Sequence, residues 1–351
     1  MRTLDPGNFR KILVRGTNWI GDAVMTTPAL GAIRSAFPRA EIVLLANPAV
    51  SELMQNHPSC DRVIVYDKKG AHKGIGGLLR LSGALAGEDF DLAVLLQNAI
   101  EAAIIAFAAR IGTRAGYRTD GRGFLLTHGV PVSEEALRLH HTQYYLNMLA
   151  MLGIPVHEPH LSLFCTDGEK RAARRLLGEG RWLGINPGAA FGSAKRWYPE
   201  RFAEVADRLA SEYRFKVLLL GGPGETEIGA AIENAMGTAP LNMIGKTSVR
   251  EAMALMSCMD LVVTNDSGPM HVAAAFDRPL VALFGPTDHT TTSPVCSNYR
   301  IVRADTECAP CLKRQCPTDH RCMTAISVEM VLDAVDRVMR KAGLQAWKSF
   351  R

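Results

Sequence analysis

The sequence predicts an α/β fold made of two domains, each with a parallel sheet covered by helices. Short apolar runs rich in branched residues alternate along the chain with longer segments of helical periodicity, and this order builds parallel sheets. The length of 351 residues exceeds that of a typical single domain. Glycine-rich or polar turns follow several of the predicted strands, at the end of the sheet where α/β enzymes keep their sites.

Composition narrows the class of protein. Hydrophobic residues make up 47% of the chain and charged residues 21%, as in soluble globular proteins. The longest apolar stretch, 92–111, contains Gln97, Glu101 and Arg110 and is therefore not expected to span a membrane. The first residues lack the apolar core of a signal peptide, so we expect a cytoplasmic protein. The net charge of +5 fits an anionic ligand or surface but is too small to indicate nucleic acid binding.

The first predicted domain covers residues 1–160. Its predicted strands lie at 11–15, 41–46, 62–66 and 92–96. Helical segments follow them at 23–37, 49–56, 73–85 and 99–111, and a longer helix is predicted at 134–152. The proline-containing passage from 155 to 168 is the candidate hinge.

The turn after the first strand, GTNWIGD, carries a candidate functional carboxylate. Asp22 follows the carboxyl end of a strand, where α/β sites lie, although a helix N-cap is the alternative. Gly16 and Gly21 do not form the dinucleotide fingerprint G-x-G-x-x-G. The next strand also ends without the acidic residue that holds a ribose in nicotinamide enzymes, which weighs against a dehydrogenase.

Four arginines recur between 110 and 122, spaced four residues apart. Interleaved glycines make a continuous helix unfavourable, so the sequence predicts a basic loop. The loop either binds a phosphorylated or carboxylated acceptor or forms a solvated charged surface. Its arginines are Arg110, Arg114, Arg118 and Arg122.

The second predicted domain covers residues 161–351. Predicted strands lie at 182–186, 216–220, 241–244, 261–264 and 280–284, and helices at 199–213, 249–258 and 328–342. The last helix is amphipathic, and we expect its apolar side to pack across a domain, with the first domain as one candidate. The tail beyond it carries Trp347 and Phe350 and is a weaker candidate for contact with a membrane surface. Two similar sheets would leave a cleft suited to transfer between two bound substrates.

The segment DLVVTNDSGPMHVAAAF, 260–276, has the pattern of a strand, a tight turn and a helix. The N–H groups and the positive dipole end of such a helix favour an anion, and Gly268 allows a diphosphate to approach the backbone. Asp266 and Ser267 either belong to this phosphate site or are simple helix caps. Lys195, in the first turn of the second domain, is a candidate for neutralising charge on a departing nucleoside diphosphate. Glu225, in the turn GGPGE, either accepts hydrogen bonds from a ribose or stabilises the start of the next helix.

Four of the eight cysteines crowd into CAPCLKRQCPTDHRC. The spacing predicts a closed tetrahedral metal site, with zinc as the expected ion and His320 as a substitute ligand. An iron–sulfur cluster and free thiols are the alternatives, while disulfides require an oxidising compartment. A closed site of this kind would hold a loop in place and take no part in catalysis. Its four cysteines are Cys308, Cys311, Cys316 and Cys322.

Four stretches of the chain resemble the ADP-heptose:lipopolysaccharide heptosyltransferases of glycosyltransferase family 9, most closely those of type II. They are RGTNWIGDAVMTTPAL, RAGYRTDGRGFLLTHGVP, NPGAAFGSAKRWYPERFAEVA and TNDSGPMHVAAAFDRPLVALFGPT. The resemblance implies a GT-B fold, two Rossmann-like domains facing a central cleft. It also implies inverting transfer of a heptose from ADP-heptose to the lipopolysaccharide inner core (Kdo-lipid A) without a cofactor. Types I and III, which use other acceptors, are the alternatives.

The resemblance also implies roles for particular residues. Asp22 matches the general base, Lys195 the contact to the donor diphosphate, and Glu225 the contact to the adenosine ribose. The residues expected to bind ADP and the transferred sugar are Asp266, Ser267, Gly268 and His271. These roles agree with the chemistry, because inversion needs one base and a stabilised leaving group. An enzyme with a membrane-bound acceptor is also expected to contact the inner face of the inner membrane.

One segment departs from the family pattern. In NAIEA, 98–102, Ala99 and Glu101 stand where the family often has a serine and a basic residue. An acidic side chain beside an anionic acceptor is unfavourable, so acceptor contacts are not expected from this helix.

Overall fold

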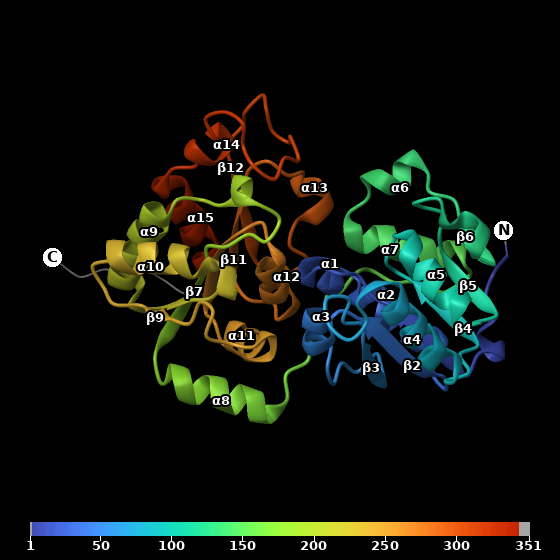
Figure 1. The fold of residues 1–351 in the computed structure, drawn as a ribbon. Coiled ribbons are helices and arrows are strands. Elements are labelled where there is room, and N and C mark those ends of the chain that lie inside the picture. Colours follow the sequence, from blue (N-terminus) through green and yellow to red (C-terminus); the bar gives the residue numbers. More distant parts are fainter. Residues whose placement is uncertain (1, 344–351) are drawn as a thin grey trace. The chain divides into compact units, whose positions relative to one another are not determined.

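The computed structural model describes residues 2–343, and the aromatic tail residues Trp347 and Phe350 lie outside this range. The chain divides into two compact units, Met1–Phe164 and Cys165–Arg351, close to the boundary expected after residue 160. Each unit contains one sheet with its own helices (Figure 1). Within residues 2–343, none of the helices has both the length and the apolar character needed to cross a membrane.

The sheet of the first unit has six parallel strands in the order β3-β2-β1-β4-β5-β6. The strands are β1 (Lys11–Arg15), β2 (Glu41–Ala46), β3 (Arg62–Val65), β4 (Leu92–Leu95), β5 (Thr113–Tyr117) and β6 (His128–Val130). The helices are α1 (Ile20–Met25), α2 (Thr27–Ala36), α3 (Pro48–Leu53), α4 (Gly74–Ala86), α5 (Ile100–Ala108), α6 (Glu134–Arg138) and α7 (His141–Met151). The strand order reverses between β1 and β4, and doubly wound sheets bind their ligands at such a switch point.

The sheet of the second unit repeats this topology, in the order β12-β11-β10-β7-β8-β9. Its strands are β7 (Arg181–Asn186), β8 (Phe215–Leu219), β9 (Leu241–Asn242), β10 (Leu261–Asn265), β11 (Leu280–Phe284) and β12 (Tyr299–Arg303). Its helices are α8 (Asp167–Leu177), α9 (Pro199–Tyr213), α10 (Thr226–Ala235), α11 (Val249–Met256), α12 (Gly268–Ala275), α13 (His289–Thr292), α14 (Arg321–Thr324) and α15 (Val328–Lys341). The switch point lies between β7 and β10.

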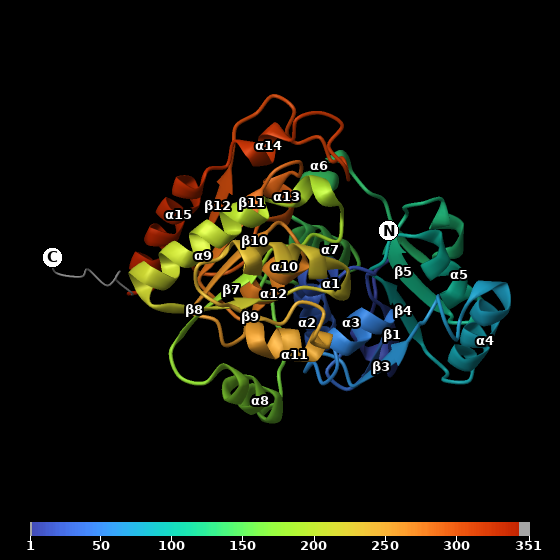
Figure 2. The same ribbon diagram turned by 60° about the vertical axis from the view of Figure 1, so that its left-hand side comes forward.

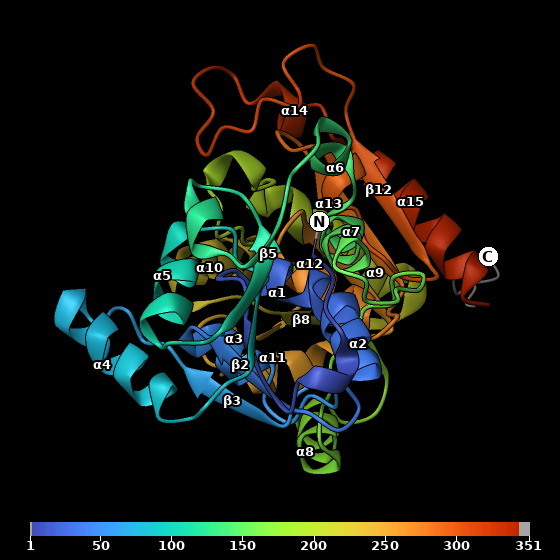
Figure 3. The same ribbon diagram turned by 90° about the vertical axis from the view of Figure 1, so that its right-hand side faces the viewer.

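Burial explains why the central strands read as continuous apolar runs. Every residue of β10 and β11 is buried, because helices cover both faces of the sheet. The core of the second unit joins side chains of the sheet to those of α9 and α15, two helices that lie side by side in Figure 2. α15 packs against β11, β12 and α9, and Figure 3 shows it beside β12. It buries Val331, Val335 and Val338. The apolar side of the last predicted helix is therefore used within its own unit.

The arginine-rich segment is not the predicted loop throughout. Residues 113–117 form β5, which pairs with β4 on one side and β6 on the other. At Gly116 a Cβ atom would lie 3.1 Å from the Leu95 carbonyl oxygen, so glycine permits the close pairing of the strands here. Gly116, one of the glycines that indicate a loop in the sequence, thus serves a crowded strand instead.

The predicted helix 134–152 is two helices, α6 and α7. Leu139 and His140 between them have extended backbones, with ψ angles of 152° and 141°. The His140 ring accepts a hydrogen bond from the Thr142 N–H at 3.3 Å and thereby caps α7. A side-chain cap of this kind interrupts an otherwise helical pattern.

The predicted hinge runs into α8, a helix that the sequence prediction omitted. Thr166 and Glu169 form a reciprocal capping box at its start. The Glu169 carboxylate also binds Arg250 of α11, at 2.7 Å from Nε and 2.6 Å from Nη2, and α8 packs against α11. The Arg250 guanidinium lowers the pKa of Glu169 to about 2. The bidentate pair fixes the start of the second unit to α11.

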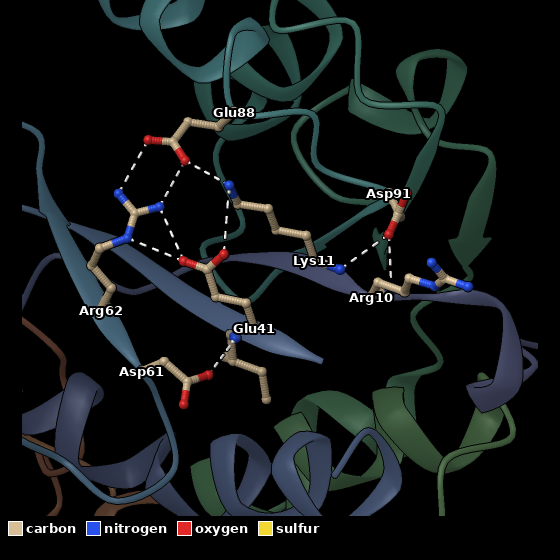
Figure 4. Close-up of polar contacts among 8 residues, drawn as sticks. Arg10, Lys11, Glu41, Asp61, Arg62, Glu88 and Asp91 are labelled. Atoms are coloured by element: carbon tan, nitrogen blue, oxygen red, sulfur yellow. Dashed lines mark hydrogen bonds and ion pairs between the residues drawn. The ribbon is translucent and has the colours of Figure 1, made fainter. Parts of the chain in front are cut away.

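The amino ends of β1, β2 and β3 carry an ion-pair network, on the side of the sheet away from the switch-point turns (Figure 4). Lys11, Glu41 and Arg62 are the first residues of these strands. Glu88 lies 2.7 Å from both Lys11 Nζ and Arg62 Nη2. The hydrogen bonds from Arg62 and Lys11 lower the pKa of Glu88 to about 2. Side-chain contacts of this network thus connect the amino ends of the three neighbouring strands, in addition to their backbone pairing.

Candidate active site

Polar residues end the two strands at the switch point of the second sheet. Asn186 is the last residue of β7, and its side-chain amide donates to the Leu220 carbonyl at 2.8 Å. Asn265 is the last residue of β10 and donates to the Pro187 carbonyl at 2.7 Å. Its side-chain oxygen accepts from the Trp197 N–H at 3.2 Å. The two asparagines fix the turn that follows β7 against the end of β10.

Lys195 and Asp266 come together across this switch point. Lys195 Nζ lies 2.6 Å from Asp266 Oδ2, and the Thr287 hydroxyl donates to the same oxygen at 2.5 Å. Only 3% of Asp266 is exposed. A buried ion pair needs further hydrogen bonds to offset its desolvation, and Thr287 supplies one. The structure thus places Lys195 beside the turn that the sequence identified as the phosphate site.

The residues after Asp266 are not simple caps. Ser267 precedes α12, but its hydroxyl caps no helical N–H and lies 3.3 Å from Asn186 Oδ1. Asp266 holds Lys195 instead of capping the helix, so the capping alternative fails for both residues. Gly268 is the first residue of α12, and His271 is buried in the same helix. Four of the residues predicted to bind the donor, Asp266, Ser267, Gly268 and His271, therefore lie within six positions at the start of one helix.

Glu225 lies in the turn after β8, half-buried. Its carboxylate accepts a hydrogen bond from the Gly222 N–H at 2.8 Å, which stabilises the short 3₁₀ turn Pro223–Glu225. A Cβ atom at Gly188 would overlap the Glu225 carboxylate, so the turns after β7 and β8 approach each other closely here. The Glu225 side chain stabilises this turn but caps no N–H group of α10, and the ribose contact stays a prediction.

Asp22 lies at the switch point of the first sheet. It is the third residue of α1, and Trp19 occupies the N-cap position, so Asp22 is not the cap. Its Oδ1 lies 3.9 Å from the His141 ring nitrogen Nδ1, and about a third of its side chain, 34%, is exposed. A partly exposed carboxylate just beyond β1 is accessible to a substrate hydroxyl.

Buried polar atoms without a hydrogen-bond partner lie in the turns that follow β1 and β4, at the same sheet edge as Asp22. Gln97 and Asn98 follow β4, the neighbour of β1, and the N–H groups of Leu96 and Gln97 both donate to the Arg15 carbonyl. Among the described residues, Thr17 Oγ1, Gln97 Oε1 and Asn98 Oδ1 are buried without a hydrogen-bond partner. Such atoms are costly unless a ligand or water satisfies them. These three atoms thus retain hydrogen-bonding capacity for water or a ligand.

The three arginines predicted to bind an acceptor differ in what their side chains do. Arg122 has no exposed surface, and its guanidinium donates to the carbonyls of Gln97 and, at 2.8 Å, Tyr117. Burial lowers its pKa to about 10. Arg114 donates to the carbonyls of Ile111 and, at 2.7 Å, Leu125. The acceptor prediction does not fit Arg114 and Arg122, because their N–H groups donate to main-chain carbonyls. Of the three arginines, only Arg118 is exposed.

Glu101, the unexpected acidic residue of α5, forms an ion pair with Lys68. Lys68 follows β3, so the pair joins the turn after β3 to the start of α5 at the carboxyl edge of the first sheet. The charge of Glu101 is thus matched within the protein, which removes the conflict that the sequence raised.

The cysteines do not assemble the predicted zinc site in this structure. All four are free thiols, and in residues 2–343 no three His, Cys, Asp or Glu side chains are placed to hold a metal ion. The Cys308 thiol donates to Thr306, and burial raises the pKa of Cys322 to about 11. His320 lies 2.7 Å from the Ala194 carbonyl oxygen. Cys308 and Cys311 are exposed and Cys322 is buried, so the four thiols do not converge here, and zinc at the cysteines stays a prediction.

Comparisons with known proteins agree on one family. Residues 78–321, more than half of the chain, match the model for "Glycosyltransferase family 9 (heptosyltransferase)". Lipopolysaccharide heptosyltransferase 2 of Salmonella typhimurium is 31% identical over 95% of this chain and 100% of its own length.

Solved structures give the same result. An Escherichia coli ADP-heptose lipopolysaccharide heptosyltransferase II matches with a TM-score of 0.82 and 28% identity, over 95% of this chain and 99% of that one. A family 9 glycosyltransferase of Veillonella parvula matches with a TM-score of 0.84 and 25% identity, over 96% and 98%. The predicted α/β GT-B fold class is confirmed.

Proposed function

We propose the reaction of this protein from one premise: the chain belongs to glycosyltransferase family 9, the heptosyltransferases, and is a glycosyltransferase. It transfers L-glycero-D-manno-heptose from ADP-heptose to the heptose of the lipopolysaccharide inner core, the reaction of heptosyltransferase II. The observation that carries the proposal is the Lys195–Asp266–Thr287 group beside the start of α12. Similarity to type 2 enzymes over nearly the whole chain supports the choice among the types.

The second unit holds the donor. The N–H groups at the start of α12 and the ammonium of Lys195 favour the diphosphate of ADP-heptose. Asp266 fixes the position of Lys195, so the cation is in place before the reaction begins. A fixed cation stabilises charge that develops on the leaving diphosphate without reorganisation.

The first unit holds the acceptor. Asp22 accepts the proton of the acceptor hydroxyl, and the unpartnered atoms of Thr17, Gln97 and Asn98 accept hydrogen bonds from further hydroxyls of the sugar. A carboxylate with a partly exposed side chain fits a base that must meet an incoming hydroxyl.

The reaction is a single displacement. The acceptor oxygen forms a bond to the anomeric carbon as the bond from that carbon to the β-phosphate oxygen breaks. The proton moves from the acceptor hydroxyl to Asp22, and the electron pair leaves with ADP beside Lys195. One base and one stabilised leaving group suffice, so the configuration at the anomeric carbon inverts.

The test is ADP release by the purified protein supplied with ADP-heptose and Kdo-lipid A that carries either no heptose or one heptose. We expect release only with the one-heptose acceptor. Release with the heptose-free acceptor would identify a type I enzyme, and release with neither acceptor would contradict transfer to both of these acceptors.

The location follows from the acceptor. A core lipopolysaccharide is anchored in the membrane, so we place the protein in the cytoplasm at the inner face of the inner membrane. The net charge of +5 supports contact with anionic lipid headgroups. Co-sedimentation with vesicles of phosphatidylethanolamine and phosphatidylglycerol measures this contact, and we expect it to weaken with added salt.

We propose that transfer needs no cofactor, and zinc at the cysteines stays a prediction. Elemental analysis of protein purified in reducing buffer tests it: one zinc per chain, removed together with the loss of several degrees in Tm, would support a structural role. Chelation is expected to leave the chemistry of transfer unchanged.

A further inference from the structure

The loop that carries three of the four clustered cysteines, residues 304–320, is attached to the candidate donor site. The Ala194 N–H, next to Lys195, donates to the Arg314 carbonyl at 3.1 Å. The Leu312 N–H donates to the Pro286 carbonyl, next to Thr287, at 2.8 Å. This loop, here called the cysteine loop, is therefore bound to the two turns that supply Lys195 and Thr287.

The approach of the cysteine loop to the donor turn is too close for a side chain. A Cβ atom at Gly192 would overlap the Arg314 carbonyl group. Leu312 adopts a left-handed backbone with a φ of 56°, which costs energy for a residue other than glycine. Packing of this kind fixes the backbone of Arg314 relative to Lys195.

The side chains of Arg314 and Lys195 both lie against the aromatic ring of Phe191. The Arg314 guanidinium carbon lies 5.4 Å from the centre of the Phe191 ring, and Lys195 Nζ lies 5.0 Å from it. Arg314 is exposed and forms no ion pair within the described part of the chain. A second cation is thus held at the donor site, on the ring that contacts Lys195.

The charges of Lys195, Asp266 and the donor diphosphate explain why a second cation at the donor site matters. The charge of Lys195 is matched by Asp266 at 2.6 Å, so the pair brings no net charge to the site. The diphosphate of a nucleotide sugar carries two negative charges. Arginine presents several N–H donors in a fork that suits phosphate oxygens.

We propose that Arg314 is a donor-binding residue, whose guanidinium contacts the diphosphate of a nucleoside diphosphate donor beside Lys195. This inference rests on the proposed function and extends it to a residue of the cysteine loop. The cysteine loop thus contributes a cation to the donor site.

The test is calorimetric binding of ADP and AMP to the full-length protein in reducing buffer. A charge-assisted contact to phosphate predicts that Arg314→Gln weakens ADP binding at least tenfold. AMP binding should weaken much less, because AMP lacks the second phosphate. Arg314→Lys should restore part of the ADP affinity, and Lys313→Gln, which removes the same charge one residue away, should leave it unchanged.

Three outcomes would overturn the inference. The first is an Arg314→Gln protein that binds ADP as the wild type does. The second is an equal loss of ADP and AMP affinity with a lowered Tm, which would assign Arg314 a structural role. The third, a wild type that binds no ADP, would overturn the proposed donor itself and this inference with it.

Discussion

Asp22 is the proposed base and does not cap α1, which makes its substitution informative. Asp22→Asn keeps the size of the side chain and removes the proton acceptor. We expect kcat to fall by about 10² to 10⁴ while ADP affinity is unchanged. Steady-state ADP release and calorimetry measure the two quantities. Glu135→Gln, an exposed carboxylate in the first turn of α6, is the matched control. Full transfer activity in the Asp22 variant would refute the mechanism.

Lys195 has a proposed role in catalysis and also pairs with the buried Asp266, and a double variant separates the two roles. Lys195→Met leaves Asp266 buried and unpaired, so we expect a loss of about 3 to 5 kcal/mol of unfolding free energy. Removal of the cation should also lower kcat by about 10² to 10³. Adding Asp266→Asn should restore stability in urea unfolding but not activity. Recovery of both properties would show that Lys195 only neutralises Asp266.

At the scale of elements, the ion-pair network at the amino ends of β1, β2 and β3 predicts a pH dependence. The folded pKa of Glu88 is about 2, below its ordinary value of 4.5. Its contribution to stability is therefore complete above pH 4.5 and is lost as the pH falls toward 2. Glu88→Gln should cost about 1 kcal/mol or less at pH 7, because the pairs are partly exposed. Urea unfolding of both proteins between pH 7 and 3 tests this, and a difference that grows at low pH would contradict it.

Helices and strands could be predicted from the sequence where a single local pattern, such as an apolar run, determines the structure. The buried strand β10 and the turn at Asp266 follow from an apolar run that ends in capping residues and a glycine. β5 was missed because its residues, TRAGY, include only one branched side chain, and the neighbouring strands decide its conformation. Arg314 was missed because its role depends on Phe191, which lies far away in the chain. Thr287 had a signal, since it closely follows β11 at the same sheet edge.

At the scale of the whole molecule, each unit has its own hydrophobic core, so ligand binding should stabilise one unit more than the other. We expect ADP to raise the melting temperature of the second unit. At one hundred times Kd the gain is about 2.7 kcal/mol. Hydrogen exchange followed by mass spectrometry, with and without ADP, locates the protection. Equal protection of the strands of both sheets would contradict the assignment of the donor to the second unit.

Strand β1 links two regions with different tasks. Its first residue, Lys11, belongs to the ion-pair network, and its last residue, Arg15, leads into the turn that carries Asp22. The five residues of the strand span about 16 Å. This is roughly twice the Debye length of about 8 Å at physiological ionic strength. Exposed charges at the amino edge are therefore largely screened from Asp22, so substitutions that raise stability at that edge are expected to leave the proposed base little changed.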